Sequence, residues 1–162
     1  MWSQVFVQQA RSDWEVFEHL RQTAFPRCHM LHYLQMASEK LAKAYLLASL
    51  KDLRMKKSHK ALTRFLRHVV RNRKLQTAMG MDAKQLRSHV MHFLPLAYDI
   101  EILAPSLAQD RPNPEYPWQD PNGQFVTPAK HHFRVIELLR EPTGYSLIKF
   151  LRLSLTRFDL LN

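Results

Sequence analysis

Two side chains that could act on RNA, Arg54 and His59, lie five residues apart in the middle of the chain. RNA cleavage without a metal ion needs a base for the ribose 2′-hydroxyl and a cation for the phosphate. A histidine and an arginine supply these roles where they meet on one surface. The same spacing occurs twice more in the chain, as often as chance predicts, so context must favour the pair. The alternative is that His59 is an ordinary helix residue that packs locally.

The context of this pair is a strongly basic segment. Residues 54–74 contain nine lysines and arginines and no acidic residue, and they hold nearly all of the excess in the net charge of +10. A block of one sign indicates a polyanionic partner, such as nucleic acid, nucleotide phosphates or an acidic protein. The alternative is a solvated helix face without an anionic ligand. The candidate residues for binding RNA or a nucleotide are Lys56, Lys57, Lys60, Arg64, Arg67 and Arg71.

Motifs for other chemistries are absent from the sequence. It contains no Gly-x-Ser-x-Gly and no glycine-rich phosphate loop. His29 and His32, like His89 and His92, lie one helical turn apart, but no cysteine or inward carboxylate accompanies them. We therefore expect ordinary histidines, no metal site and no cofactor. The single cysteine, Cys28, excludes an internal disulfide and is expected to be buried.

The distribution of apolar residues argues against a membrane protein. No segment has the eighteen or so uncharged residues that a membrane span needs. The first ten residues lack a basic region followed by an apolar core, so they do not have the form of a signal peptide. We expect a cytoplasmic protein that does not bind membranes.

The chain is predicted to be organised around one long helix, residues 30–50. Apolar and small residues recur there at spacings of four and three, without an internal glycine or proline. They are Met30, Leu34, Ala37, Leu41, Ala44 and Ala48. The alanines would let a neighbouring helix approach closely, so this segment is interpreted as the central helix of a bundle.

Similar patterns predict further helices on both sides of this one. Their expected starts are Asp13, Ser58, Asp82, Pro128 and Thr143, with a kink or break near Pro95. Ser12 and Glu15 have the form of a capping box. Residues 1–11 before it are assigned to an N-terminal extension, with a first turn of helix as the alternative. Residues 72–81 are expected to form a loop that ends at Gly80.

Residues 109–127 form a second, longer loop that is rich in proline. Tyr116, Trp118 and Phe125 are expected to pin it to the bundle. The last helix is more apolar than a surface helix needs and is a candidate dimer interface. The predicted fold is all-α: one domain over residues 1–162, an up-and-down bundle of five or six helices with one long Pro-rich loop.

Three short stretches resemble the HEPN domain family. They are Ala37-Ser38-Glu39-Lys40-Leu41-Ala42-Lys43, His59-Lys60-Ala61-Leu62 at the start of the next helix, and Glu115-Tyr116-Pro117 after the long fourth helix. The resemblance covers about residues 12–150 and implies a four- or five-helix bundle, often dimeric. Many members bind nucleotides or cleave RNA without metal, as toxins or defence effectors, and others have lost catalysis. The nuclease members use Arg-x4–6-His, with a polar residue after the arginine; here Met55 follows Arg54.

These observations support two function classes. The first is a HEPN-like homodimer that binds RNA or a nucleotide through the basic segment. In its sharper form it is a metal-independent ribonuclease of toxin–antitoxin type, with His59 as base and Arg54 as phosphate ligand. The second is a catalytically inactive helical interaction module. There the basic segment, the last helix and the Pro-rich loop would hold an acidic partner protein.

Overall fold

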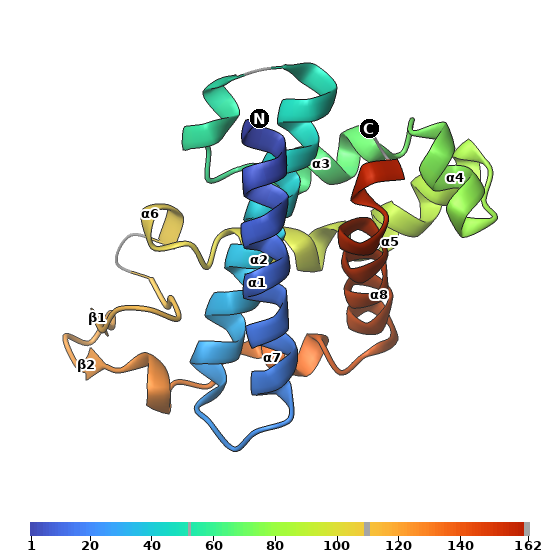
Figure 1. Ribbon diagram of the computed structural model, residues 1–162. Helices are drawn as coiled ribbons and strands as arrows, with labels where there is room; N and C mark the ends of the chain where they lie inside the picture. The colour runs from blue at the N-terminus through green and yellow to red at the C-terminus, as the bar shows by residue number, and fades with distance from the viewer. Residues whose placement is uncertain (52, 109–110, 161–162) are drawn as a thin grey trace.

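The structure, a computed structural model, describes residues 1–51, 53–108 and 111–160, and most of these residues are helical (Figure 1). The substantial helices are α1 (Trp2–Arg21), α2 (Arg27–Leu50), α3 (Leu62–Val69), α4 (Arg73–Met79), α5 (Ala83–Glu101) and α8 (Pro142–Thr156). The shorter elements are η1 (Leu53–Lys57), α6 (Pro105–Ala108), β1 (Trp118–Gln119), β2 (Phe125–Val126), η2 (Pro128–Lys130), α7 (Arg134–Leu138) and η3 (Phe158–Leu160). The all-α prediction is confirmed, with one addition, since the two short strands pair antiparallel as a small hairpin.

The central element is α2, as predicted. Fifteen of its 24 residues are buried, so its neighbours cover it on almost every side. It packs antiparallel against α1, and Pro26 precedes its first turn, where a missing N–H is not needed. Ala37 and Ala44 are fully buried, as the close packing of helices in a bundle requires.

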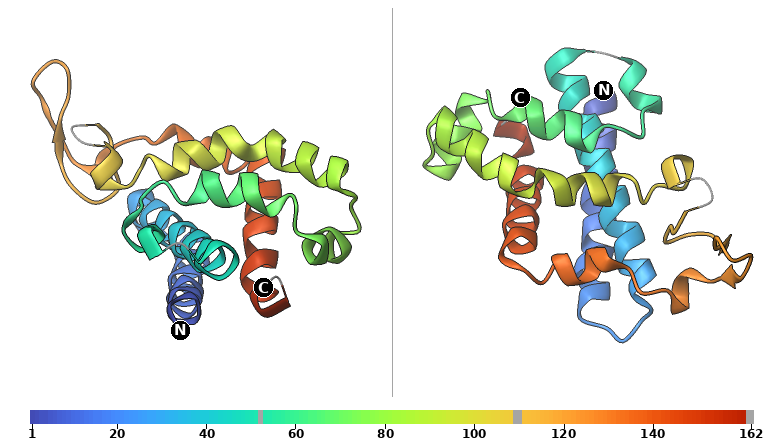
Figure 2. Two further views of the ribbon diagram at one scale, coloured as in Figure 1. Left: turned by 90° about the horizontal axis from the view of Figure 1, so that it is seen from above. Right: turned by 180° about the vertical axis from the view of Figure 1, so that it is seen from behind.

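The helices form two crossing layers (Figure 2). One layer contains the α1–α2 hairpin and α8, and α3 and α5 lie side by side across it, antiparallel to each other. Three buried phenylalanines, one from each helix, join α3, α5 and α8. The ring centroid of Phe150 lies 5.3 Å from that of Phe93 and 6.2 Å from that of Phe65. None of the described helices is long and apolar enough to cross a membrane.

The prediction of an N-terminal extension is wrong. Helix α1 begins at Trp2, and Ser12 lies exposed in its middle, so the capping box does not form. Val7 and Ala10 are fully buried, because the apolar side of the helix continues toward the N-terminus against α2. Packing of this face outweighs the local capping signal at Ser12.

The predicted loop over residues 72–81 is also wrong, because it contains α4. Asn72 caps this helix by accepting a hydrogen bond from the backbone N–H of Leu75 at 2.9 Å. Gly80 ends it with a φ of 63°, a left-handed conformation that glycine adopts without strain. The predicted break at Gly80 is therefore confirmed.

The boundaries of α3 and α5 were predicted with mixed success. Helix α3 begins at Leu62, not at Ser58, whose hydroxyl accepts from the backbone N–H of Lys60 instead. The cap at Asp82 is confirmed, and it forms a capping box with Gln85. Helix α5 continues through Pro95 as a single helix.

The predicted helix over residues 128–140 is divided into η2 and α7. His131 between them has an extended backbone. Its ring packs edge-on against Trp118 and Phe133, with centroids 4.9 and 4.7 Å away. These aromatic contacts favour the extended backbone over a continuous helix.

The Pro-rich loop is held by only part of the predicted anchor. Trp118 is buried, but Tyr116 and Phe125 are exposed, so these two do not pin the loop. Residues 109 and 110 of the predicted loop lie outside the described residues.

Helix α8 begins at Pro142 and carries the predicted apolar stripe. Leu147, Ile148, Leu151 and Leu155 are buried within the chain. The apolar excess of this helix therefore belongs to the core, and these side chains are not part of an exposed dimer surface.

Candidate functional site

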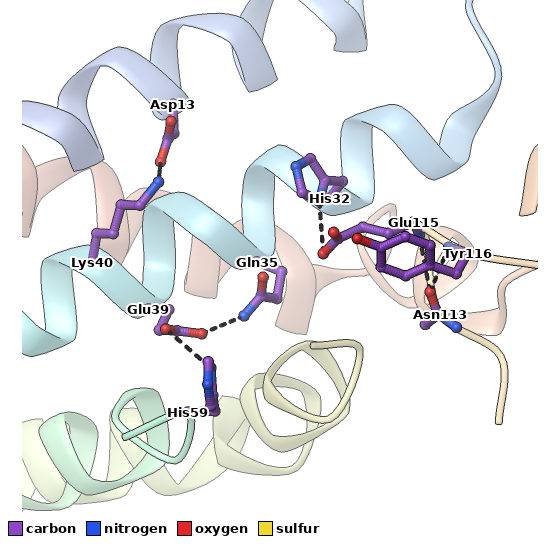
Figure 3. Close-up of polar contacts among 9 residues, drawn as sticks. All are labelled: Asp13, His32, Gln35, Glu39, Lys40, His59, Asn113, Glu115 and Tyr116. Atoms are coloured by element: carbon purple, nitrogen blue, oxygen red, sulfur yellow. Dashed lines mark hydrogen bonds and ion pairs between the residues drawn. The ribbon is translucent and has the colours of Figure 1, made fainter. Parts of the chain in front are cut away.

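A buried polar network connects α2 to the start of the basic segment (Figure 3). Glu39 accepts hydrogen bonds from the side chains of Gln35 at 2.8 Å and Lys43 at 2.6 Å. The Nδ1 atom of His59 lies 3.5 Å from the same carboxylate. Glu39 and Lys43 are both buried, and each charge is compensated by the other. In this chain, the Glu-Lys stretch that resembles the HEPN family holds His59 against the central helix.

Lys40, the next residue on α2, contacts a different neighbouring helix. The ammonium of Lys40 lies 2.5 Å from a carboxylate oxygen of Asp13 on α1, and Asp13 is buried. Successive helix residues point about 100° apart, so Glu39 and Lys40 join α2 to two different neighbours.

His59 keeps part of its surface in solvent, with 46% of its side chain exposed, while its ring contacts Glu39. Arg54 lies exposed in η1, and Met55 after it is buried. Catalytic roles for Arg54 and His59 stay predictions.

The six cations predicted to bind RNA or a nucleotide are spread over several surfaces. Lys60 and Arg67 line a cleft beside α3. Arg71 lines a separate shallow depression with Lys84 and Arg87. The basic segment therefore does not form one continuous face.

The other three cations of this set lie outside both hollows. The ammonium of Lys56 lies 4.1 Å from the centroid of the Trp2 ring, a cation–π contact. A guanidinium nitrogen of Arg64 lies 3.2 Å from the sulfur of Met55. Lys57 is exposed at the end of η1.

The cleft beside α3 has a volume of about 760 Å³. The start of α3, the end of α5, α6 and the segment from His131 to Leu138 form its walls. Among the residues that the structure describes, four lysines and arginines line it: Lys60, Arg67, Arg111 and Arg134. Two histidines (His131 and His132), two carboxylates (Asp99 and Glu101) and the exposed ring of Tyr98 also line it.

Glu101 has a structural task in this cleft. Its buried carboxylate accepts hydrogen bonds from the backbone N–H of Thr63 at 3.1 Å and from the Thr63 hydroxyl at 2.8 Å. Helix α3 has no capping side chain of its own, because Ala61 stands at its N-cap. Glu101 therefore replaces the missing cap and fixes the start of α3, next to Lys60.

The remaining titratable groups respond to burial. Burial raises the pKa of Asp99, although the positive charge of Arg134 opposes this shift. Burial, together with the charge of His132, lowers the pKa of His131. His132 itself lies 3.0 Å from the carboxylate of Glu137, and both side chains are exposed. The charge of the cleft thus comes mainly from its lysine and arginine residues.

Sequence reasoning missed half of the cations in this cleft. Arg111 and Arg134 lie far outside the basic segment, and only the fold brings them near Lys60 and Arg67. The local signal was the run from Lys130 to Arg134, which contains two lysine or arginine residues and two histidines.

The Glu115-Tyr116-Pro117 stretch is held by a separate set of contacts (Figure 3). The carboxylate of Glu115 lies 3.2 Å from Nδ1 of His32 on α2. The buried side chain of Asn113 accepts hydrogen bonds from the backbone N–H groups of Glu115 and Tyr116. The Glu115–His32 contact attaches this segment to the central helix, and the Asn113 hydrogen bonds fix its local turn.

Two further side-chain predictions concern metal and the cysteine. Within the described ranges, no three His, Cys, Asp or Glu side chains lie close enough together to hold a metal ion. Cys28 is buried, as expected, and burial raises its pKa. A raised pKa leaves less of the reactive thiolate at neutral pH.

Comparisons with protein-family models, with curated proteins and with solved structures found no significant match to this chain. The fold establishes the class of protein, a mostly helical bundle with a small hairpin. Any function assigned to this chain therefore rests on the residues and geometry of its own hollows.

Proposed function

We propose that this chain is a HEPN-like helical domain that binds the phosphates of single-stranded RNA or of a nucleotide in the cleft beside α3. One observation carries the proposal: four cations from separate parts of the chain converge on a hollow of about 760 Å³. Lys60 and Arg67 come from the basic segment, and Arg111 and Arg134 come from the second half of the chain. Convergent lysine and arginine side chains are the usual means of holding phosphate groups.

The carboxylates of the cleft do not cancel this positive charge. Glu101 is occupied by two hydrogen bonds from Thr63, and its charge faces the positive N-terminal end of α3. With both Glu101 and Asp99 charged, the four lysine and arginine side chains still outnumber the two carboxylates of the cleft. A phosphate entering the cleft therefore meets an excess of positive charge.

Tyr98 supplies a surface for a base. Its ring is 55% exposed and lines the same cleft. Stacking of a base on an aromatic ring contributes roughly 1–3 kcal/mol and tolerates any base, as RNA binding without sequence preference requires.

The HEPN-like part of the proposal is supported by the network around Glu39. Glu39 and Lys43, two of the residues that carry the resemblance, are buried and hydrogen-bonded to each other, and Glu39 contacts His59, next to Lys60. Cytoplasmic location and a homodimer stay predictions that the sequence made.

Charge reversal in the cleft tests the proposal. We expect the double variant Lys60→Glu/Arg67→Glu to lower the affinity for a labelled single-stranded RNA of about ten nucleotides at least tenfold. Fluorescence anisotropy at several salt concentrations measures the affinity, and the dependence on salt should become shallower in the variant. Competition by unlabelled ATP separates a nucleotide site from a site that needs a longer strand.

The matched control is Arg71→Glu/Lys84→Glu, which changes the net charge equally in the shallow depression outside the cleft. This control should retain most of the RNA affinity. Arg64→Glu reverses one charge on α3, at a residue that lines neither hollow. Equal losses in the two double variants would show that general positive charge, and not the cleft, binds RNA.

A ribonuclease activity is the second candidate, and the contact between His59 and Glu39 favours it. A carboxylate beside Nδ1 can hold an imidazole in one orientation, as a general base requires. In this version Arg54 holds the phosphate. Incubation with RNA in EDTA should give cleavage that His59→Ala abolishes and that His29→Ala, at an exposed histidine, preserves. Absence of cleavage, or equal cleavage by all three proteins, removes this candidate.

A further inference from the structure

A second hollow lies between α4 and α8, away from the cleft. It has a volume of about 680 Å³ and a mostly apolar surface. Met79 and Met81 form one side, and Phe150 and Leu153 of α8 form the other. Phe150 is buried in the core, while the methionines and Leu153 keep part of their surface in solvent. We refer to this hollow as the α4–α8 groove.

The lysine and arginine side chains of the α4–α8 groove give its rim a positive charge. Lys149, Arg152 and Arg157 line it, and no carboxylate does so within the described part of the chain. Arg152 donates a hydrogen bond to Glu18 on α1 at 2.7 Å. Lys149 and Arg157 form no ion pair with any described residue. Two exposed cations therefore flank an apolar surface, and no carboxylate among the described residues pairs with them.

The lowered pKa of His89 is consistent with the cations around the groove. His89 lines the same groove, and its pKa is lowered by burial and by the charges of His92 and Lys149. A positive charge is therefore unfavourable at this position, mainly because the ring is partly buried and also because His92 and Lys149 are close.

We propose that the α4–α8 groove binds one amphipathic helix of an acidic partner protein. Its apolar face would lie on Met79, Met81 and Leu153, and its carboxylates would reach Lys149 and Arg157. Helices dock in grooves of this kind through apolar residues spaced by three and four. Methionine side chains suit this use because they are flexible and adapt to different apolar partners.

Charge and surface type decide between this occupant and the alternatives. A second copy of the chain has a net charge of +10, and several of its acidic residues are already paired internally. RNA would match the rim but not the apolar floor, where its phosphates would lose hydration without a hydrogen-bonding partner. An acidic amphipathic helix matches both.

The experiment uses the full chain and three labelled helical peptides of about 18 residues. Each has leucines on one face, and the other face carries glutamates, neutral residues or lysines. Fluorescence anisotropy should show the tightest binding for the acidic peptide and the weakest for the basic one. The double variant Lys149→Glu/Arg157→Glu should weaken the acidic peptide about tenfold, since each exposed ion pair contributes up to about fivefold. Ala78→Glu, which places a carboxylate at an exposed position of the groove, should also weaken it.

The matched control, Lys130→Glu/Arg140→Glu, changes the charge equally at two exposed sites outside the groove and should leave peptide binding unchanged. Circular dichroism of each variant checks that the fold is retained. The proposal is overturned if the peptides bind without regard to their charge, or if the groove variant binds like the control. It is also overturned if the groove variant loses RNA affinity together with peptide affinity, because the groove would then belong to the RNA surface.

Discussion

The cleft beside α3 and the α4–α8 groove are similar in size and in the sign of their charge, but they differ in their floors. Their volumes are about 760 and 680 Å³, and lysine and arginine residues line both. The cleft combines apolar residues with carboxylates, histidines and the ring of Tyr98. The groove combines methionines, Leu153 and Phe150 with one histidine, and no described carboxylate lines it. The linings of the two hollows therefore fit different ligands.

This difference shows that positive charge alone does not define a ligand. The positive charge favours an anionic ligand in both hollows. The other lining residues determine which ligand fits: phosphates and a base in the cleft, and an apolar helix face in the groove. The net charge of +10 points to anions in general. Only the arrangement of the floors separates an RNA site from a protein site.

The largest expected effect is a loss of stability on truncation of Phe150, which lines the groove and belongs to the core. Phe150 is 1% exposed and packs between Phe65 and Phe93. Phe150→Ala should lower the free energy of unfolding by about 4 kcal/mol, because it removes buried apolar surface and also leaves a cavity. Urea denaturation measures the change. Phe125→Ala, at a ring that is 85% exposed, is the control and should change the stability by less than about 0.5 kcal/mol.

Such a loss at Phe150 would show that the groove floor is part of the core, and that only its rim is free to bind. A loss below about 1.5 kcal/mol would contradict this and would mean that the groove can rearrange around a smaller side chain.

The parts of the fold that sequence predicted well are those with strong local signals. The long apolar period of α2, the N-cap at Asp82 and the stripe of α8 are each contained in one segment. The start of α1 was missed because burial of Val7 and Ala10 depends on α2. Helix α4 was missed because seven residues are too few to show a period.

The cations of the cleft were likewise only partly predictable from the sequence. Lys60 and Arg67 lie in the basic segment that the sequence predicted. Arg111 and Arg134 could not be added, because their approach to α3 depends on how the chain returns after α5. The sequence shows which residues are basic. Which hollow each of them lines depends on how the helices pack.

An intermediate effect is expected from the buried carboxylate of the cleft. Glu101→Gln removes a charged acceptor from the two hydrogen bonds with Thr63, so the free energy of unfolding should fall by about 2 kcal/mol. The groove should be unaffected, and binding of the acidic peptide should not change. Thermal and urea denaturation measure the stability.

Glu137→Gln makes the same chemical change at an exposed carboxylate that contacts His132. Its effect should stay within about 0.5 kcal/mol, as is usual for exposed pairs. Equal effects at Glu101 and Glu137 would show that Glu101 does not cap α3.

The smallest effect is the response of the cleft to pH. Burial and His132 lower the pKa of His131 below the ordinary value of 6.5, so His131 is mostly neutral in the free protein at neutral pH. A bound phosphate favours the protonated ring and raises that pKa. RNA affinity should therefore rise a few-fold as the pH falls from about 7.5 to about 5.5.

Stability should respond to the same histidine with the opposite sign. Because the folded pKa of His131 is depressed, its contribution to stability is present above pH 6.5 and is lost as the pH falls below that value. His131→Phe keeps the ring contacts with Trp118 and Phe133 and removes the titration, so both pH dependences should become weaker. His89→Phe, at the histidine of the groove, should leave the pH dependence of RNA binding unchanged. If His89→Phe altered that dependence as much as His131→Phe, the two hollows would share one ligand, and the distinction between them would fail.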